Sequence, residues 1–178
     1  KLSVFFIDED QVVTWSDIGS KAEIRKWANM LGAQVHERRL VSQFRCNGSD
    51  GYLAWVDHAL QIHETANRTL DSADYEFVVH DDPNELRESI FARNKLANKA
   101  RMVAGYCWDW RSKKEANAMD IAIPGFGFEA QWNLEKDGSL WIIAEESVRE
   151  IGCIHTSQGL ELDHIGVIFG PDLVVRDG

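Results

Sequence analysis

The chain has 178 residues, of which 44% are hydrophobic and 27% are charged, and its formal net charge at pH 7 is −10. This length suits a globule with one core, and the composition excludes a disordered or collagen-like chain. So negative a charge argues against a protein that coats nucleic acid through a broadly basic surface. It is compatible with a motor that holds one strand in a groove, because the charge of a groove can differ from that of the whole chain.

The three cysteines are widely spaced and include no CxxC pair, which favours reduced thiols over a disulfide framework or a zinc site. The six histidines show no metal-ligand spacing. No apolar run has the length of a membrane span, and the first residues lack the pattern of a signal peptide. We therefore expect a bacterial-type cytoplasmic protein with no metal site and no membrane partner.

The first third of the chain predicts a strand, a helix, an extended segment over residues 34–40 and a second helix. Residues 2–7 are a short apolar run that ends in three acids, as a buried parallel strand does at its functional end. Ser16 or Asp17 can cap a helix, Ser20 and Glu23 have the spacing of a capping box, and Gly32 is a suitable helix end. A second helix, capped by Ser49, is expected to bury Leu53, Val56 and Leu60.

The middle of the chain continues the alternation of strands and helices. Residues 75–79 predict another buried strand, and Asp82 followed by Pro83 predicts a helix that runs to about Asn98. Residues 101–106 predict the next strand. This order implies an α/β fold, with a mainly parallel sheet and helices on both faces.

The last third predicts a β-hairpin and two further strands. Residues 111–128 have no clear period, whereas residues 130–133 and 140–143 flank a Lys-Asp-Gly-Ser turn and predict an inserted β-hairpin. Residues 151–154 and 165–169 are apolar strands around the segment HTSQGLELDH.

Two short motifs in the first 50 residues suggest phosphate chemistry. In FFIDEDQ, acids follow a strand at the end where parallel sheets bind ligands. Asp8 and Glu9 are either a Walker B pair or, with Gln11, the D-x-x-Q of helicase motif III; a third interpretation is a solvated turn. In QFRC, Arg45 offers the planar fork of donors that suits a γ-phosphate, although an arginine at such a junction is commonly a surface ion pair.

HTSQGLEL, positions 155–162, is the most specific signal in the chain. A strand is expected to end at His155, so that Thr156 and Ser157 can cap a short helix whose free N–H groups favour a phosphate. Gly159 allows close approach of the backbone to a ligand, and Glu161 can accept a hydrogen bond from a ribose hydroxyl. The alternative is a capped crossover that binds nothing.

Aromatic and basic residues near the middle of the chain have a structural interpretation. Trp108 and Trp110 are expected to pack in the core or a hairpin. The basic residues of this stretch are expected to lie in a solvated loop, although such a cluster can also follow a phosphate backbone; they are Arg111, Lys113 and Lys114.

These motifs resemble those of superfamily 1 helicases: FFIDEDQ resembles motif III, QFRC motif IV and HTSQGLEL motif V. Arg45 follows Gln11 by 34 positions. This separation is similar to the gap between motifs III and IV in such helicases and too short for the gap between a Walker B motif and motif IV, so motif III is preferred. Over nearly the whole chain, the segments QFRCNGSDGYLAW, DDPNELRE, VAGYCWDW and GCIHTSQGLELDHIGVIFGPDL resemble the bacterial Schlafen group 3-like DNA/RNA helicase domain.

The resemblance implies a RecA-like fold of the P-loop NTPase type. Residues 1–33 are then the last strand and helix of a first RecA-like domain, and residues 34–178 a second one, truncated before motif VI. The phosphate-loop lysine, the Walker B acids and the arginine finger are expected elsewhere in a longer polypeptide. Phosphoryl transfer requires all of them together, so this chain alone is expected to be inactive and to hold no tightly bound cofactor.

The resemblance also implies roles for single residues. With ATP and Mg²⁺ in the full-length protein, Gln11 would sense the γ-phosphate, Arg45 would contact it, and Gly159 and Glu161 would lie at the ribose. The residues implied for contact with single-stranded DNA or RNA are His155, Thr156 and Trp15.

The leading hypothesis is therefore an ATP-dependent DNA or RNA helicase or translocase that works with the remainder of the same polypeptide, including the first RecA-like domain. The alternative is a non-catalytic helicase-like interaction or regulatory module. A nuclease that uses the three acids of FFIDEDQ is a third hypothesis, which their adjacency on one strand end disfavours.

Overall fold

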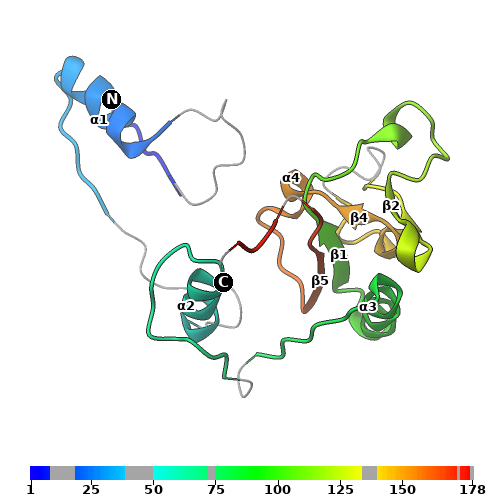
Figure 1. Ribbon diagram of the computed structural model, residues 1–178. Helices are drawn as coiled ribbons and strands as arrows, with labels where there is room; N and C mark the ends of the chain where they lie inside the picture. The colour runs from blue at the N-terminus through cyan, green and yellow to red at the C-terminus, as the bar shows by residue number, and fades with distance from the viewer. Residues whose placement is uncertain (9–18, 39–49, 72–74, 134–139, 172, 177–178) are drawn as a thin grey trace. The chain divides into compact units, whose positions relative to one another are not determined.

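The computed structural model describes residues 1–8, 19–38, 50–71, 75–133, 140–171 and 173–176. The chain divides into two compact units, Lys1–Phe44 and Arg45–Gly178 (Figure 1). That residues 1–33 and 34–178 belong to two RecA-like domains stays a prediction. Within the described ranges, no helix is long and apolar enough to cross a membrane.

The first unit contains helix α1, Lys21–Met30. As expected, the Ser20 side chain caps it by accepting a hydrogen bond from the Glu23 backbone N–H at 3.2 Å, and Gly32 follows with φ +65°. The strand expected over residues 2–7 does not form: residues 1–8 have no regular structure, and Phe6 is exposed. A strand needs a partner for its backbone groups, and no described segment of this unit pairs with these residues.

The second unit begins with helix α2, Asp50–Ala59, where a helix was predicted. The rings of Tyr52 and Tyr75 stack at 3.9 Å between centroids, and Trp55 meets Phe77 edge-on at 4.9 Å. The strand expected over residues 75–79 is wrong, because this segment is not hydrogen-bonded into a sheet. Its aromatic side chains pack on α2 instead.

Helix α3, Pro83–Ala97, starts and ends as its sequence predicts. The Asp82 carboxylate accepts a hydrogen bond from the Asn84 N–H at 2.7 Å, and Pro83 occupies the first turn, where a missing N–H costs nothing. Asn98 ends the helix in the left-handed conformation, with φ 50°.

A parallel sheet of three strands in the order β4-β1-β5 forms the centre of this unit. The strands are β1, Ala100–Ala104, β4, Ile151–Gly152, and β5, His164–Ile168. This sheet and its helices confirm the α/β prediction. Helix α3 covers one face, and Gly166 permits the contact, since a Cβ there would lie 2.9 Å from Cγ1 of Ile90. On the other face, Trp141 packs over Gly152.

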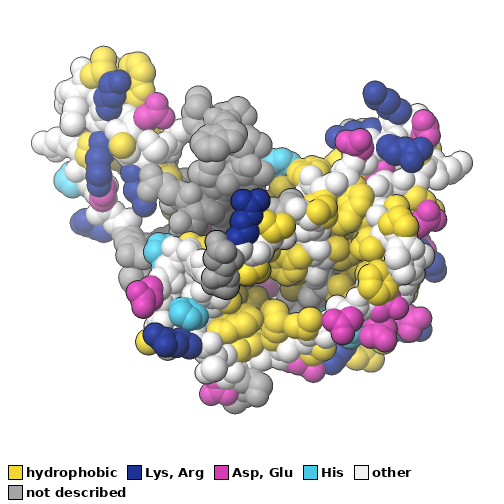
Figure 2. Space-filling view, in the orientation of Figure 1, with side chains coloured by type: hydrophobic (Ala, Val, Ile, Leu, Met, Phe, Trp, Pro, Cys, Tyr) yellow, Lys and Arg dark blue, Asp and Glu magenta, His cyan; other side chains and the backbone are white. Residues whose placement is uncertain are grey.

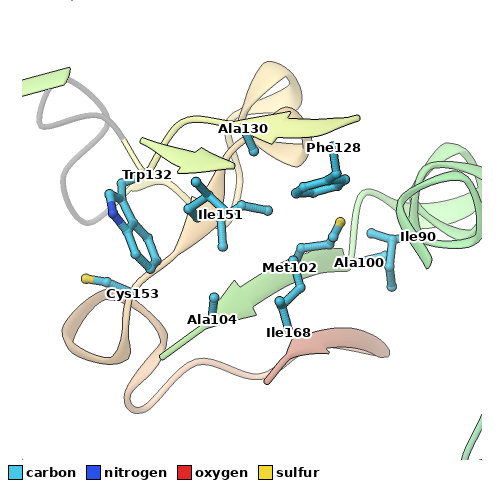
Figure 3. Close-up of a cluster of buried hydrophobic side chains, with 11 residues drawn as sticks. Ile90, Ala100, Met102, Ala104, Phe128, Ala130, Trp132, Ile151, Cys153 and Ile168 are labelled. Atoms are coloured by element: carbon cyan, nitrogen blue, oxygen red, sulfur yellow. The ribbon is translucent and has the colours of Figure 1, made fainter. Parts of the chain in front are cut away.

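An antiparallel hairpin of β2, Ile121–Ile123, and β3, Phe128–Ala130, packs over the sheet and completes the core (Figure 3). It is joined by the short 3-10 helix η4, Pro124–Phe126, and by Gly127 with φ +60°. The hairpin was predicted further along the chain, over residues 130–133 and 140–143, and that prediction is wrong. Trp132 instead bridges to Ile151 in parallel, and residues 141–143 form a turn; the expected turn, 136–139, lies outside the described residues.

Candidate functional site

The carboxyl ends of the parallel strands meet at one edge of the sheet, which is where open α/β sheets bind ligands. Tyr106 follows the end of β1, Cys153 follows β4, and Gly170 follows β5. A Cβ on Gly170 would lie only 2.3 Å from Sγ of Cys107, so the chain segments that leave β1 and β5 are in close contact. The segment HTSQGLEL starts from this edge.

The turn that follows β4 differs in detail from its prediction. The strand ends at Gly152 and not at His155, and helix α4, Ile154–Ser157, is capped at Cys153. The N–H groups of Thr156 and Ser157 both donate to the Cys153 carbonyl at 3.0 Å. His155 and Thr156 therefore lie inside the first turn of α4, and neither Thr156 nor Ser157 caps it.

One side-chain amide explains why the strand ends early. The Oδ1 atom of Asn133 accepts a hydrogen bond from the Cys153 backbone N–H at 3.1 Å, where a longer strand would pair with a neighbouring strand. The Ser157 hydroxyl donates back to the Cys153 carbonyl at 3.1 Å, which fixes the same turn from its other end. The Asn133 contact spans 20 positions, so it has no signature in the local sequence.

The thiol of Cys153, 2% exposed, is the centre of a small hydrogen-bond cluster. Burial raises the pKa of Cys153, but hydrogen bonds from Thr156, from Tyr106 and from the backbone N–H groups of Thr156 and His155 outweigh it and lower that pKa. Desolvation, followed by the hydrogen bond to Cys153, raises the pKa of Tyr106 to about 12. The backbone N–H groups of His155 and Thr156 thus help to lower the pKa of this thiol, and a phosphate contact there stays a prediction.

The loop from α4 to β5 carries the two residues predicted at the ribose. Gly159 has φ +82°, a conformation that strongly favours glycine, and a Cβ there would meet no described atom within 4 Å. Glu161 is exposed. Both residues are therefore open to their surroundings among the described residues, and their roles stay predictions.

Tyr106 is a site residue that the sequence analysis missed, because the predicted strand ran through it. Its ring is 49% exposed and lies 5.5 Å from the Trp132 ring, 6.5 Å from Trp110 and 6.1 Å from His155, between centroids. Gly105 directly before it was the available signal for an earlier strand end. The packing role predicted for Trp108 and Trp110 is confirmed, since both are partly buried against the hydrophobic core and Nε1 of Trp108 donates to the Ala122 carbonyl of β2 at 3.1 Å.

Three predicted site residues lie outside the described residues, and nothing tests their roles: Gln11, Trp15 and Arg45. Among the residues that are described, no three His, Cys, Asp or Glu side chains gather as metal ligands.

Comparison with known proteins identifies a family. The family described as Schlafen group 3, DNA/RNA helicase domain, matches residues 1–178. The uncharacterized protein YPL245W of Saccharomyces cerevisiae is 23% identical over 190 residues, a match that covers 96% of this chain and 41% of that protein. The chain thus spans about two fifths of the length of this relative. No solved structure matches the chain.

Proposed function

The chain belongs to the Schlafen group 3 DNA/RNA helicase domain family, and from this premise we propose that it is the part of an ATP-dependent helicase or translocase that senses bound ATP and contacts the nucleic-acid strand. The observation that carries the proposal is the position of HTSQGLEL. This segment leaves the carboxyl edge of a parallel sheet, with Gly159 in a left-handed conformation and Glu161 exposed.

The proposed nucleotide contacts follow from the chemistry of each side chain. The Glu161 carboxylate accepts hydrogen bonds from a ribose hydroxyl, and Gly159 lets the backbone approach the sugar. Arg45 presents a charged fork to the γ-phosphate, and Gln11 responds to the loss of that phosphate. His155 and Thr156, in the first turn of α4, contact the single-stranded nucleic acid, and Trp15 stacks on one of its bases.

In this proposal the chain supplies only part of the ATPase, and the rest of the polypeptide supplies the other catalytic groups. Phosphoryl transfer needs a phosphate-loop lysine, a metal ion and an arginine finger acting together, and Mg²⁺ with ATP supplies the metal and the substrate. The remainder of the polypeptide contributes the lysine and the finger from RecA-like elements. Closure of the two parts on ATP, and their release after hydrolysis, move the strand.

Binding of a fluorescent, non-hydrolysable ATP analogue to the full polypeptide tests the nucleotide site. Glu161→Ala and Arg45→Ala should each weaken binding by about tenfold, because each removes one charged or charge-assisted contact. Glu88→Ala on α3 is the matched control, since Glu88 is exposed and far from HTSQGLEL in sequence. Equal affinities for the parent, both site variants and the control would contradict the proposal.

The alternative, a non-catalytic interaction module, makes the opposite prediction. The net charge of −10 is compatible with it. Such a module would bind the analogue in none of these forms, and the full polypeptide would lack a G-x-x-x-x-G-K-[ST] segment.

A further inference from the structure

We propose that the loop after β1 and the neighbouring His155 hold a single strand of nucleic acid, with bases stacked on aromatic rings and phosphates paired with basic side chains. This aromatic–basic loop consists of Tyr106, Trp110, Arg111, Lys113 and Lys114. The inference rests on the proposed function, since it names where the strand is held. None of the loop residues belongs to the motifs FFIDEDQ, QFRC or HTSQGLEL.

Tyr106 and His155 form the first part of the binding surface. Tyr106 comes from the end of β1 and His155 from α4, and their rings lie 6.1 Å apart between centroids at the carboxyl edge of the sheet. Both side chains are exposed, whereas Trp132, which backs the Tyr106 ring at 5.5 Å, is fully buried. A rigid indole behind an exposed ring gives a stacking platform that is already in place before the strand arrives.

Trp110 forms the second part. The Nζ atom of Lys113 lies 4.1 Å from the centroid of the Trp110 ring, and the lysine side chain is exposed. An exposed cation–π contact is weaker than the stacking of a nucleobase on an aromatic ring, so a base can displace the ammonium. The displaced ammonium stays close enough to pair with the phosphate of that same nucleotide.

The space beside Trp110 is open. A depression of about 370 Å³ is lined by Trp110 together with Asp109, Arg111, Lys114 and Glu115. Its two acids oppose a phosphate, but Nη2 of Arg111 lies 3.7 Å from Oε2 of Glu115 and offsets that charge in part.

The basic side chains and aromatic rings of the loop together favour nucleic acid as the partner. An acidic protein surface would pair with the basic groups but would offer no bases to stack on the rings. Residues 109–115 hold three basic and two acidic side chains in a chain whose net charge is −10. Figure 2 shows Lys and Arg side chains gathered with acidic ones over the segment of the second unit that joins β1 to β2. Rings beside basic groups are the combination that binds single strands without sequence preference, whereas a duplex hides the faces of its bases.

Fluorescence anisotropy with labelled single strands tests the charge of the loop. The probes are oligothymidylate and oligouridylate of roughly 12 nucleotides, added to the full polypeptide without ATP. The double variant Lys113→Glu/Lys114→Glu should bind at least about tenfold more weakly than the parent. The slope of log K against log salt concentration should also fall in magnitude by about 1.4, since each of the two lost phosphate contacts contributes about 0.7.

The control double variant, Lys95→Glu/Lys99→Glu, changes the net charge by the same amount at exposed positions near the end of α3. It should bind within about twofold of the parent, because the effect is local. An equal loss in the two double variants would show that only net charge matters and would overturn the inference. Absence of binding by the parent at low salt would overturn it as well.

A pair of substitutions at Tyr106 separates stacking from folding. Tyr106→Phe keeps the ring and removes only the hydroxyl that bonds Cys153, so it should bind the strands like the parent. Tyr106→Ala removes the ring and should lose about tenfold, with an unchanged circular dichroism spectrum. Equal losses in both variants would reject stacking.

The outcomes also separate this inference from the proposed function. If strand binding depends on the loop but the full polypeptide never hydrolyses ATP, the proposed function fails and the loop assignment stands. If ATP hydrolysis is stimulated by nucleic acid while Lys113→Glu/Lys114→Glu binds strands like the parent, the loop assignment fails and the proposed function stands.

Discussion

Replacement of Arg101 by methionine should destabilise the second unit by about 2 to 4 kcal/mol. Arg101 lies on β1 with 0% of its side chain exposed. Its guanidinium donates to Oγ of Ser147 at 3.0 Å and to the carbonyls of Ile142 and Ala144 at 2.6 and 3.0 Å. It also donates to Oδ1 of Asn94 at 2.7 Å, so one side chain joins β1, α3 and the segment that contains Trp141.

The expected loss of unfolding free energy follows from the acceptor groups that lose the Arg101 guanidinium as their hydrogen-bond donor. The Ala144 carbonyl keeps a hydrogen bond from the Ser147 hydroxyl at 2.7 Å, and Oδ1 of Asn94 keeps one from the Ala100 N–H at 3.2 Å. Among the described residues, the Ile142 carbonyl has no second donor and costs about 1 to 3 kcal/mol when left unpaired. Loss of the other hydrogen bonds from the charged guanidinium adds to this cost. Methionine, however, removes the cost of burying the Arg101 charge, and this offsets much of that added loss.

Urea unfolding, followed by tryptophan fluorescence, measures the effect, and Arg93→Met is the matched control. Arg93 lies on α3 with 43% of its side chain exposed and pairs with Glu76 at 3.1 Å, a surface ion pair that contributes about 0 to 1 kcal/mol. The Arg101 variant should therefore unfold at clearly lower urea than the Arg93 variant, with the same m-value. Equal midpoints for the two variants would refute the buried network as a source of stability.

Two further perturbations test the geometry of the carboxyl edge. Gly170→Ala should cost about 1 to 3 kcal/mol, since its Cβ would lie 2.3 Å from Sγ of Cys107, whereas Gly125→Ala, which meets nothing within 4 Å, should change the urea midpoint little; equal midpoints would disprove the close contact. Because the pKa of Tyr106 is raised to about 12, this phenol should stay neutral when an ordinary tyrosine ionises. At about pH 11 roughly a tenth of Tyr106 should be ionised, against roughly nine tenths at a pKa near 10. The difference in tyrosinate absorbance between the parent and Tyr106→Phe measures this fraction, and ionisation near pH 10 would argue against the desolvation of the phenol and its hydrogen bond to Cys153, which together raise the pKa.

Helices could be predicted from the sequence because their ends depend on residues close together in the chain. The cap at Ser20 with Glu23 and the start at Asp82 with Pro83 are contacts within one turn, so local spacing specified them. The strands predicted over 101–106 and 165–169 correspond to β1, Ala100–Ala104, and β5, His164–Ile168, because both segments are mostly apolar. Their partners in the sheet, however, come from distant segments.

The failed predictions share one cause, which is that a strand depends on a partner that the local sequence does not name. Residues 2–7 and 75–79 have the composition of buried strands, yet no described strand pairs with them. The hairpin was assigned to the Lys-Asp-Gly-Ser turn, while β2 and β3 close around Gly127. Next to this hairpin, the Asp120 carboxylate accepts hydrogen bonds from the backbone N–H groups of Ser112 and Trp132 at 2.7 and 2.9 Å. These partners lie eight and 12 positions away in the sequence.

The start of the motif HTSQGLEL was predicted in place but not in detail, and the roles of its residues stay predictions. HTSQGLEL begins at the carboxyl edge of the sheet, as its position after an apolar strand indicated. The exact end of that strand depends on Asn133, which is 20 positions away, and so could not be deduced from the motif. Tyr106 was missed because the predicted strand ran through it, and its contact with Cys153 depends on β1 and β4, which are neighbours only in the folded sheet.

Phosphate release from ATP by the full polypeptide, with Mg²⁺ and with or without single-stranded DNA or RNA, tests the central claim most directly. The account predicts little release without a strand, stimulation by a single strand, and loss of that stimulation in Glu161→Ala but not in Glu88→Ala. No stimulation by any single strand, or equal stimulation in both variants, would contradict the claim that HTSQGLEL couples nucleotide to nucleic acid.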